Sequence, residues 1–187
     1  MNKKNRDSNH STTEDVPDTD LHIDKLQTSV ALSLMLDSQA AAIPALTTAL
    51  PAIEAAATAA HEQLLANSAG RLIYAGAGTS ARIGVQDGAE LPPTFSWPKK
   101  RLAFLIAGGP SALLGAIENA EDDKEAGVAD AKKIEIGKHD VVIGLAASGQ
   151  TPYTHGAILA SQAAGALTIG IVNNPDTPLL NAVSYPI

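Results

Sequence analysis

Four short apolar runs constrain the fold of this chain more than any other feature of its sequence. Apart from Arg71 and Asp140, which begin two of them, the runs are almost continuously apolar and contain β-branched residues. A strand with one face in water would instead alternate between apolar and polar residues. The runs therefore predict strands that are buried on both faces. They occupy residues 71–75, 102–106, 140–145 and 166–172.

Stretches compatible with a helix separate these runs. Alternation of strands and helices is typical of βαβ units, whose crossover is almost always right-handed. The sequence thus predicts an α/β fold, a doubly wound parallel sheet flanked by helices in a flavodoxin-like arrangement. Ligands of such sheets bind beyond the carboxyl ends of the strands, so the loops after the four runs are the candidate functional loops. The predicted helices occupy residues 80–89, 111–120 and 152–164.

The part of the chain before the first run divides into two segments. Residues 1–20 are polar and lack hydrophobic periodicity, which predicts a disordered tail. Residues 21–70 are rich in Ala and Leu at helical spacing. They predict an N-terminal helical lead-in of two or three helices, which Pro44 and Pro51 separate. The sheet domain then occupies residues 71–187.

The composition of the chain argues against several classes of binding partner. The net charge is -7 and no basic stripe occurs, so the chain is not expected to bind nucleic acid. It has no cysteine, and its five histidines lack ligand spacing, so no metal site is expected. No segment is expected to approach the roughly 18 apolar residues of a membrane span. A cytoplasmic protein that does not enter a membrane is therefore predicted.

The loop after the first run, residues 76–80, could bind a phosphate. Its small residues let the backbone approach a ligand, and two hydroxyls stand where a helix is predicted to begin. The loop lacks the later glycine of a dinucleotide-binding motif and the lysine of a P-loop, so neither motif is assigned. Gly78, Thr79 and Ser80 are the candidate binding residues, with an ordinary tight turn as the alternative.

The loop after the third run is a second candidate phosphate site. Thr151 precedes Pro152, the order expected of an N-cap and the first residue of a helix. Free N–H groups and the helix dipole would favour an anion there without a lysine, which suits an acidic chain. The candidate residues are Ser148, Gly149, Gln150 and Thr151, with an ordinary capped loop as the alternative. Both loops are expected at one edge of the sheet.

Five blocks of this sequence, in order and spacing, resemble the N-acetylmuramic acid 6-phosphate etherases. The likeness extends over most of the chain, from about residue 21 to residue 187. It implies a sugar isomerase (SIS) type of α/β domain. It also implies a carbon-oxygen lyase that cleaves the ether between D-lactate and C3 of the sugar, giving N-acetylglucosamine 6-phosphate in the recycling of the bacterial cell wall. The blocks are residues 71–80, 90–95, 105–109, 118–127 and 146–153.

The resemblance also implies site residues and partners. The family binds a phosphorylated amino sugar, uses no cofactor, and forms a homodimer whose active site draws on both subunits. Its two acid/base glutamates correspond to Glu90 and Glu121. One carboxyl must remove the C2 proton of the open sugar while another protonates the lactate oxygen on C3, and Glu90 is the predicted proton donor. Without the resemblance, the local sequence predicts that Glu121 belongs to a solvent-exposed acidic end of a helix.

Some residues depart from the pattern of the family. Gln150 stands where the family usually has arginine, which removes a positive charge beside the proposed phosphate site. Leu91 and Ala81 replace the usual cysteine and glycine. Residues 185–187 fall where the last strand of the family begins, so a truncated strand and an exposed sheet edge are predicted. A non-catalytic sugar-phosphate binding or regulatory module stays open, and a sugar-phosphate isomerase is the weaker alternative.

Overall fold

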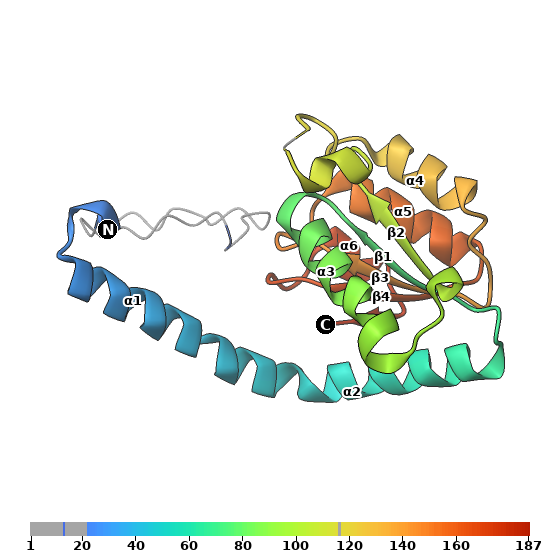
Figure 1. Cartoon of the computed structure of the whole chain (residues 1–187), viewed down its shortest axis with the longest axis horizontal. Coiled ribbons are helices and arrows are strands. Elements are labelled where there is room, and N and C mark those ends of the chain that lie inside the picture. Colours follow the sequence, from blue (N-terminus) through green and yellow to red (C-terminus); the bar gives the residue numbers. More distant parts are fainter. Residues whose placement is uncertain (1–12, 14–21, 116) are drawn as a thin grey trace, which may run out of the picture.

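The computed structural model describes residue 13, residues 22–115 and residues 117–187. A parallel sheet lies between layers of helices, and a long helical arm precedes it (Figure 1). The strand order is β2-β1-β3-β4-β5. The strands are β1 (Leu72–Gly76), β2 (Leu102–Ile106), β3 (Val141–Leu145), β4 (Leu167–Ile171) and β5 (Tyr185–Pro186). The predicted tail lies outside the described residues, apart from Thr13.

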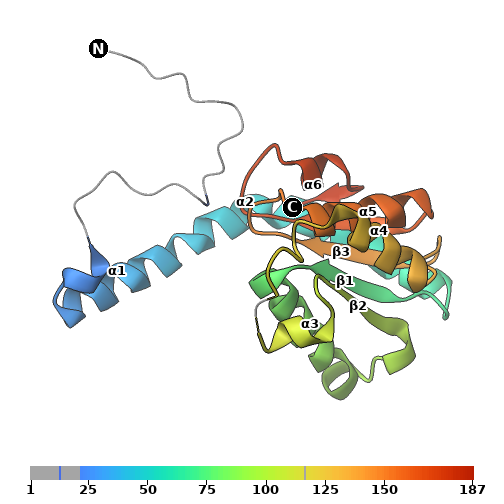
Figure 2. The same ribbon diagram turned by 90° about the horizontal axis from the view of Figure 1, so that it is seen from above.

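The predicted doubly wound sheet is confirmed, because every strand pairing is parallel and helices cover both faces. Alternate residues of β1 point to opposite faces of the sheet. Ile73 belongs to the same hydrophobic cluster as Tyr153 and Ile158, whereas Leu72 belongs to the cluster that contains Ala56. One layer contains α2 (Ala42–Ala66) and α3 (Gly78–Phe95). The other contains α4 (Lys124–Lys133), α5 (Pro152–Ala163) and α6 (Pro178–Asn181), as Figure 2 shows from above.

The carboxyl ends of the central strands meet at one edge of the sheet. Gly76 ends β1 and pairs with Ile106 at the end of β2 and with Leu145 at the end of β3. The two candidate loops therefore leave neighbouring strands at the same edge. This arrangement follows from parallel pairing in register.

The helix predicted at residues 111–120 is wrong. A short 3-10 helix, η4 (Pro110–Leu113), and turns occupy that stretch, in which Asn119 has a positive φ of 60°. The crossover helix is instead α4, which begins after Asp123 because that side chain accepts the N–H of Ala126 at 2.8 Å. The predicted helix at residues 152–164 corresponds closely to α5.

The expectation that Pro51 separates helices needs correction. Pro51 lies inside α2 and does not end it, whereas Pro44 stands in the first turn, where the missing N–H costs no helical bond. Helix α3 continues over Pro92 and Pro93. Both prolines are near its C-terminal end, where the released carbonyls can reach water. Glu90 is consequently inside the helix rather than at its end.

The arm consists of η2 (Ile23–Lys25), α1 (Thr28–Ala40) and the first half of α2, and it extends away from the sheet (Figures 1 and 2). Its large apolar side chains are exposed, including Leu36, Ile43, Leu46 and Leu50. Thr28–Ala66 is long and apolar enough to cross a membrane by length and composition alone. The expectation that no segment approaches a span was therefore wrong.

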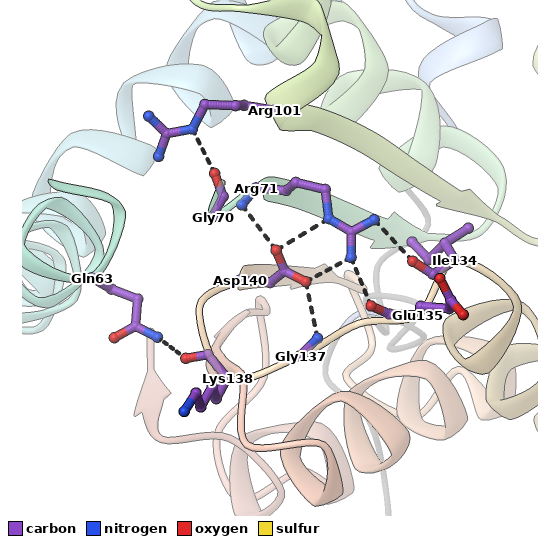
Figure 3. Close-up of polar contacts among 9 residues, drawn as sticks. All are labelled: Gln63, Gly70, Arg71, Arg101, Ile134, Glu135, Gly137, Lys138 and Asp140. Carbon is purple, nitrogen blue, oxygen red and sulfur yellow. Dashed lines mark hydrogen bonds and ion pairs between the residues drawn. The ribbon is translucent and has the colours of Figure 1, made fainter. Parts of the chain in front are cut away.

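At the amino ends of the strands, Asp140 joins β1 to β3 (Figure 3). Its carboxylate accepts hydrogen bonds from the backbone N–H of Arg71 at 2.9 Å, from the Arg71 guanidinium at 2.7 and 3.1 Å, and from the N–H of Gly137 at 3.0 Å. The guanidinium also donates to the carbonyls of Ile134 and Glu135. Asp140 is buried, and this burial alone would raise its pKa. The hydrogen bonds outweigh it and hold the pKa below its ordinary value.

Candidate functional site

A cavity of about 270 Å³ opens at the carboxyl edge of the sheet. It lies where the loops after β1 and β2 meet the segment that precedes α4. A cavity of this size can hold a small ligand. The lining residues are Ala77, Gly78, Thr79, Arg82, Ala107, Ala112, Ile117, Glu118, Asn119, Ala120 and Glu121.

The loop after β1 forms one wall of this cavity. Gly78 has a φ of 52°, a conformation that favours glycine, and no atom lies within 4 Å of the place where a Cβ would stand. Helix α3 begins at Gly78, and no side chain caps it. Its first N–H groups therefore lack intrahelical partners, and the helix dipole favours an anion near them. Of the predicted residues, Gly78 and Thr79 line the cavity, and the half-buried Ser80 does not.

Arg82 supplies the cavity with a cation that the sequence analysis missed. It lies one turn into α3, and its guanidinium donates hydrogen bonds to the carbonyls of Ala112 and Leu113, both at 3.1 Å. These bonds tie η4 to α3. The available signal was its position three residues after Thr79, which places both side chains on one face of a helix.

Two glutamates of the segment before α4, Glu118 and Glu121, also line the cavity. The carbonyl of Glu121 accepts the backbone N–H of Tyr153 at 2.9 Å, so this segment is attached to the first turn of α5. Glu121 is an exposed residue on the cavity rim. Sequence reasoning named Glu121 and overlooked Glu118, which reaches the cavity because the chain turns where a helix was predicted.

The loop after β3 lies at the same edge but does not line this cavity. Thr151 and Pro152 occupy the predicted N-cap and N1 positions of α5, yet the Thr151 side chain makes no capping bond. Pro152 has no N–H, and the N–H of Tyr153 is bonded to Glu121, so this helix end offers fewer free donors than predicted. The hydroxyl of Ser148 accepts the N–H of Gln150 at 3.2 Å.

Glu90 is distant from the cavity within one copy of the chain. It is exposed on α3 and does not line the cavity. Twelve residues separate it from Gly78, which places it about 18 Å further along the helix axis. The structure thus brings together Gly78, Thr79 and Glu121, and it separates the two predicted acid/base glutamates.

A half-buried histidine, His155, lies in α5 beyond the second loop. Its burial and the nearby Lys124 ammonium lower its pKa, so the imidazole is neutral at neutral pH. Within the described ranges, no group of three or more His, Asp or Glu side chains could hold a metal ion.

The sequence of this chain is similar to that of known proteins. A protein-family model described as the glucokinase regulatory protein N-terminal SIS domain matches residues 55–162, more than half of the chain. The chain belongs to this SIS-domain family. The fold predicted from the resemblance, an SIS-type α/β domain, is confirmed.

Relatives of this SIS domain include two bacterial enzymes. The N-acetylmuramic acid 6-phosphate etherase of Deinococcus radiodurans is 48% identical over 175 residues, which cover 94% of the chain and 57% of that protein. The etherase of the same name from Cutibacterium acnes is 43% identical over 180 residues, which cover 96% of the chain and 59% of that protein. The resemblance to etherases is confirmed. The chain spans little more than half the length of these relatives.

A solved structure, a phosphoheptose isomerase from Francisella tularensis, has the same fold as the SIS domain. The TM-score is 0.61 with 20% sequence identity, over 84% of this chain and 82% of that one. At this identity the likeness concerns the fold alone.

Proposed function

We propose that this chain is the phosphosugar-binding part of an N-acetylmuramic acid 6-phosphate etherase. The cavity carries this proposal, because an uncapped helix start, Gly78, Thr79 and Glu121 line it together. Relatives at 48% and 43% identity have this activity in their names. The products would be D-lactate and N-acetylglucosamine 6-phosphate, in the cytoplasm, during recycling of the cell wall.

The proposed reaction explains why the site needs two carboxyl groups. The C2 proton of the open sugar is acidic because it stands beside the C1 aldehyde, and a carboxylate removes it. The lactate oxygen on C3 leaves as the second carboxyl protonates it, so elimination forms an unsaturated aldehyde. Water then adds at C3 and a proton returns to C2, with the two groups in reversed roles. No cofactor takes part.

The geometry within one copy supplies Glu121 to this cavity but not Glu90. We therefore propose a homodimer in which Glu90 of one copy completes the site of the other. The Ile83 side chain, 60% exposed, lies seven residues before Glu90 and hence on nearly the same face of α3. An exposed apolar residue beside an exposed catalytic candidate is consistent with a contact between subunits.

The apolar arm is a second surface that this dimer would bury. Ile43, Leu46 and Leu50 follow one another at spacings of three and four residues, so they form one stripe along α2. We expect L46E to shift the protein from dimer to monomer, because dimerisation would bury a carboxylate among apolar side chains. Sedimentation velocity measures the change. T48E is the matched control, because Thr48 is exposed on the other side of the helix. If L46E stays a dimer, the arm does not contribute to dimerisation.

Lactate release tests the proposed function directly. Purified protein is expected to bind N-acetylglucosamine 6-phosphate in calorimetry and to release lactate from N-acetylmuramic acid 6-phosphate. Absence of binding to either sugar phosphate would refute the proposal. Lactate release is measured by a coupled dehydrogenase, and C2 exchange by the uptake of deuterium from heavy water.

A non-catalytic regulatory module is the second candidate function. Two observations favour it: the matching family model is named for a regulatory protein, and Gln150 removes a charge from the second loop. This candidate predicts binding of the sugar phosphate without lactate release and without deuterium at C2. An isomerase would instead interconvert aldose and ketose phosphates.

A further inference from the structure

Beneath the loop after β3 lies a buried amide that the proposed chemistry does not use. Asn174 follows β4, and its side chain is 5% exposed. Its Nδ2 group donates to the carbonyl of Ala147 at 3.4 Å and to the carbonyl of Ser148 at 3.2 Å. The same group donates to the hydroxyl of Thr13 at 3.1 Å. A side-chain amide thus holds two successive carbonyls of the candidate phosphate loop.

Backbone groups of the same segment hold this loop as well. The N–H of Asn173 donates to the Ala147 carbonyl at 3.0 Å, and the N–H of Leu179 donates to the Gly149 carbonyl at 3.2 Å. Gly149 has a φ of 70°, and a Cβ there would stand 2.4 Å from the Thr177 hydroxyl. The loop therefore rests directly on residues 173–179. All three of its carbonyls, from residues 147 to 149, have partners in that segment.

This anchoring has a consequence for the opposite side of the loop. In a planar trans peptide the C=O and the following N–H point in opposite directions. Carbonyls turned toward residues 173–179 therefore turn the N–H groups of Ser148, Gly149 and Gln150 away from that segment. The Gly149 N–H donates to the Ala146 carbonyl at 3.0 Å, so the N–H groups of Ser148 and Gln150 are the ones that the loop offers to a ligand. The N–H of Gln150 donates to the Ser148 hydroxyl at 3.2 Å, and a phosphate oxygen can replace this acceptor. Backbone N–H groups that face the same side of a loop can bind an anion.

We propose that Asn174 is a positioning residue of the second candidate phosphate loop, and that its amide fixes the peptide orientation of this loop after β3. This inference rests on the proposed phosphosugar ligand. Asn174 acts through the loop and does not touch the ligand. Ser148 is the carbonyl that depends on it most, because Ala147 also has the backbone N–H of Asn173.

The N174D variant tests this role, because aspartate keeps the shape of the side chain and replaces its NH₂ donor with an acceptor. We expect the Kd for N-acetylglucosamine 6-phosphate to rise by about tenfold to a hundredfold, since the Ser148 carbonyl loses its donor and the Ala147 carbonyl keeps only the N–H of Asn173. We also expect the backbone amides of Gly149 and Gln150 to exchange with solvent at least about tenfold faster in the free protein, as NMR measures.

Two matched variants separate this role from other effects. N173D adds the same charge one residue earlier, on an exposed side chain, and is expected to bind like wild type. T13V removes the third acceptor of the Asn174 amide and is also expected to bind like wild type. An equal loss in either variant would overturn the inference, since charge or the Thr13 contact would then explain it.

The exchange measurement keeps this inference distinct from the proposed function. If wild type binds no sugar phosphate, the proposed function fails, while amide exchange in the free protein still tests the anchoring. If wild type binds and a folded N174D shows unchanged affinity and exchange, only the inference fails. Should N174D not fold, N174S shortens the side chain, and unchanged affinity and exchange in that variant overturn the inference equally.

Discussion

A mixture of the Glu90→Gln and Glu121→Gln variants is expected to release lactate although neither variant does so alone. Random exchange of subunits gives heterodimers for half of the molecules, and each heterodimer has one site with both glutamates intact. About a quarter of the wild-type activity should therefore return. The measurement is the rate of lactate release before and after the variants are unfolded and refolded together.

Each single variant is expected to lose a factor of about 10² to 10⁴ in kcat, which is the usual contribution of a general acid or base. Glu125→Gln is the matched control, because Glu125 is exposed on α4 and does not line the cavity. Binding of N-acetylglucosamine 6-phosphate should persist in both variants, which would show that the fold is intact.

Glu118 provides the alternative to a shared active site. It lines the cavity together with Glu121, so one copy of the chain already holds two carboxylates there. If Glu118→Gln abolishes lactate release and Glu90→Gln does not, the acid/base pair belongs to a single chain. The mixture would then gain nothing, and the shared active site would be wrong.

The strands could be predicted from the sequence because their apolar composition indicates that they are buried. Val141, Val142 and their neighbours are apolar without interruption, which is required of strands covered on both faces. The crossover helix α4 could not be predicted in the same way. Its buried face is made of small residues such as Gly127 and Ala131, so no periodic stripe of large apolar residues marks it.

The candidate site was predictable only in part, for a related reason. The loops after β1 and β3 follow from the order of strands, and local glycine and hydroxyl residues mark them. The wall that carries Glu118 and Glu121 is positioned by tertiary contacts instead. The bond from Tyr153 to Glu121 joins segments 32 residues apart, and nothing local in the sequence encodes it. The resemblance to etherases identified Glu121 as a candidate before its contacts were known.

Asp140→Ala is expected to produce the largest loss of stability. The substitution leaves the Arg71 guanidinium without its carboxylate, and it leaves the N–H of Gly137 without an acceptor. Removing one partner of a buried ion pair typically costs about 3 to 5 kcal/mol. The Arg71 side chain is 23% exposed, so water can partly solvate the remaining charge and the lower end of this range is expected. Urea unfolding followed by circular dichroism measures the change in the free energy of unfolding. Asp24→Ala, at an exposed position, should change it by less than about 0.5 kcal/mol.

The pH dependence of this loss follows from the lowered pKa of Asp140. Burial opposes ionisation, but hydrogen bonds from Arg71 and Gly137 outweigh it, so the folded protein holds the carboxylate form more strongly than the unfolded chain does. The stabilisation is therefore complete above the unfolded pKa, near about 3.9, and is lost as the pH falls through the lower folded value. Wild type and Asp140→Ala should differ fully at pH 7 and progressively less below pH ~4. A difference that stays constant into acid would mean that packing, rather than the ion pair, accounts for the role of Asp140.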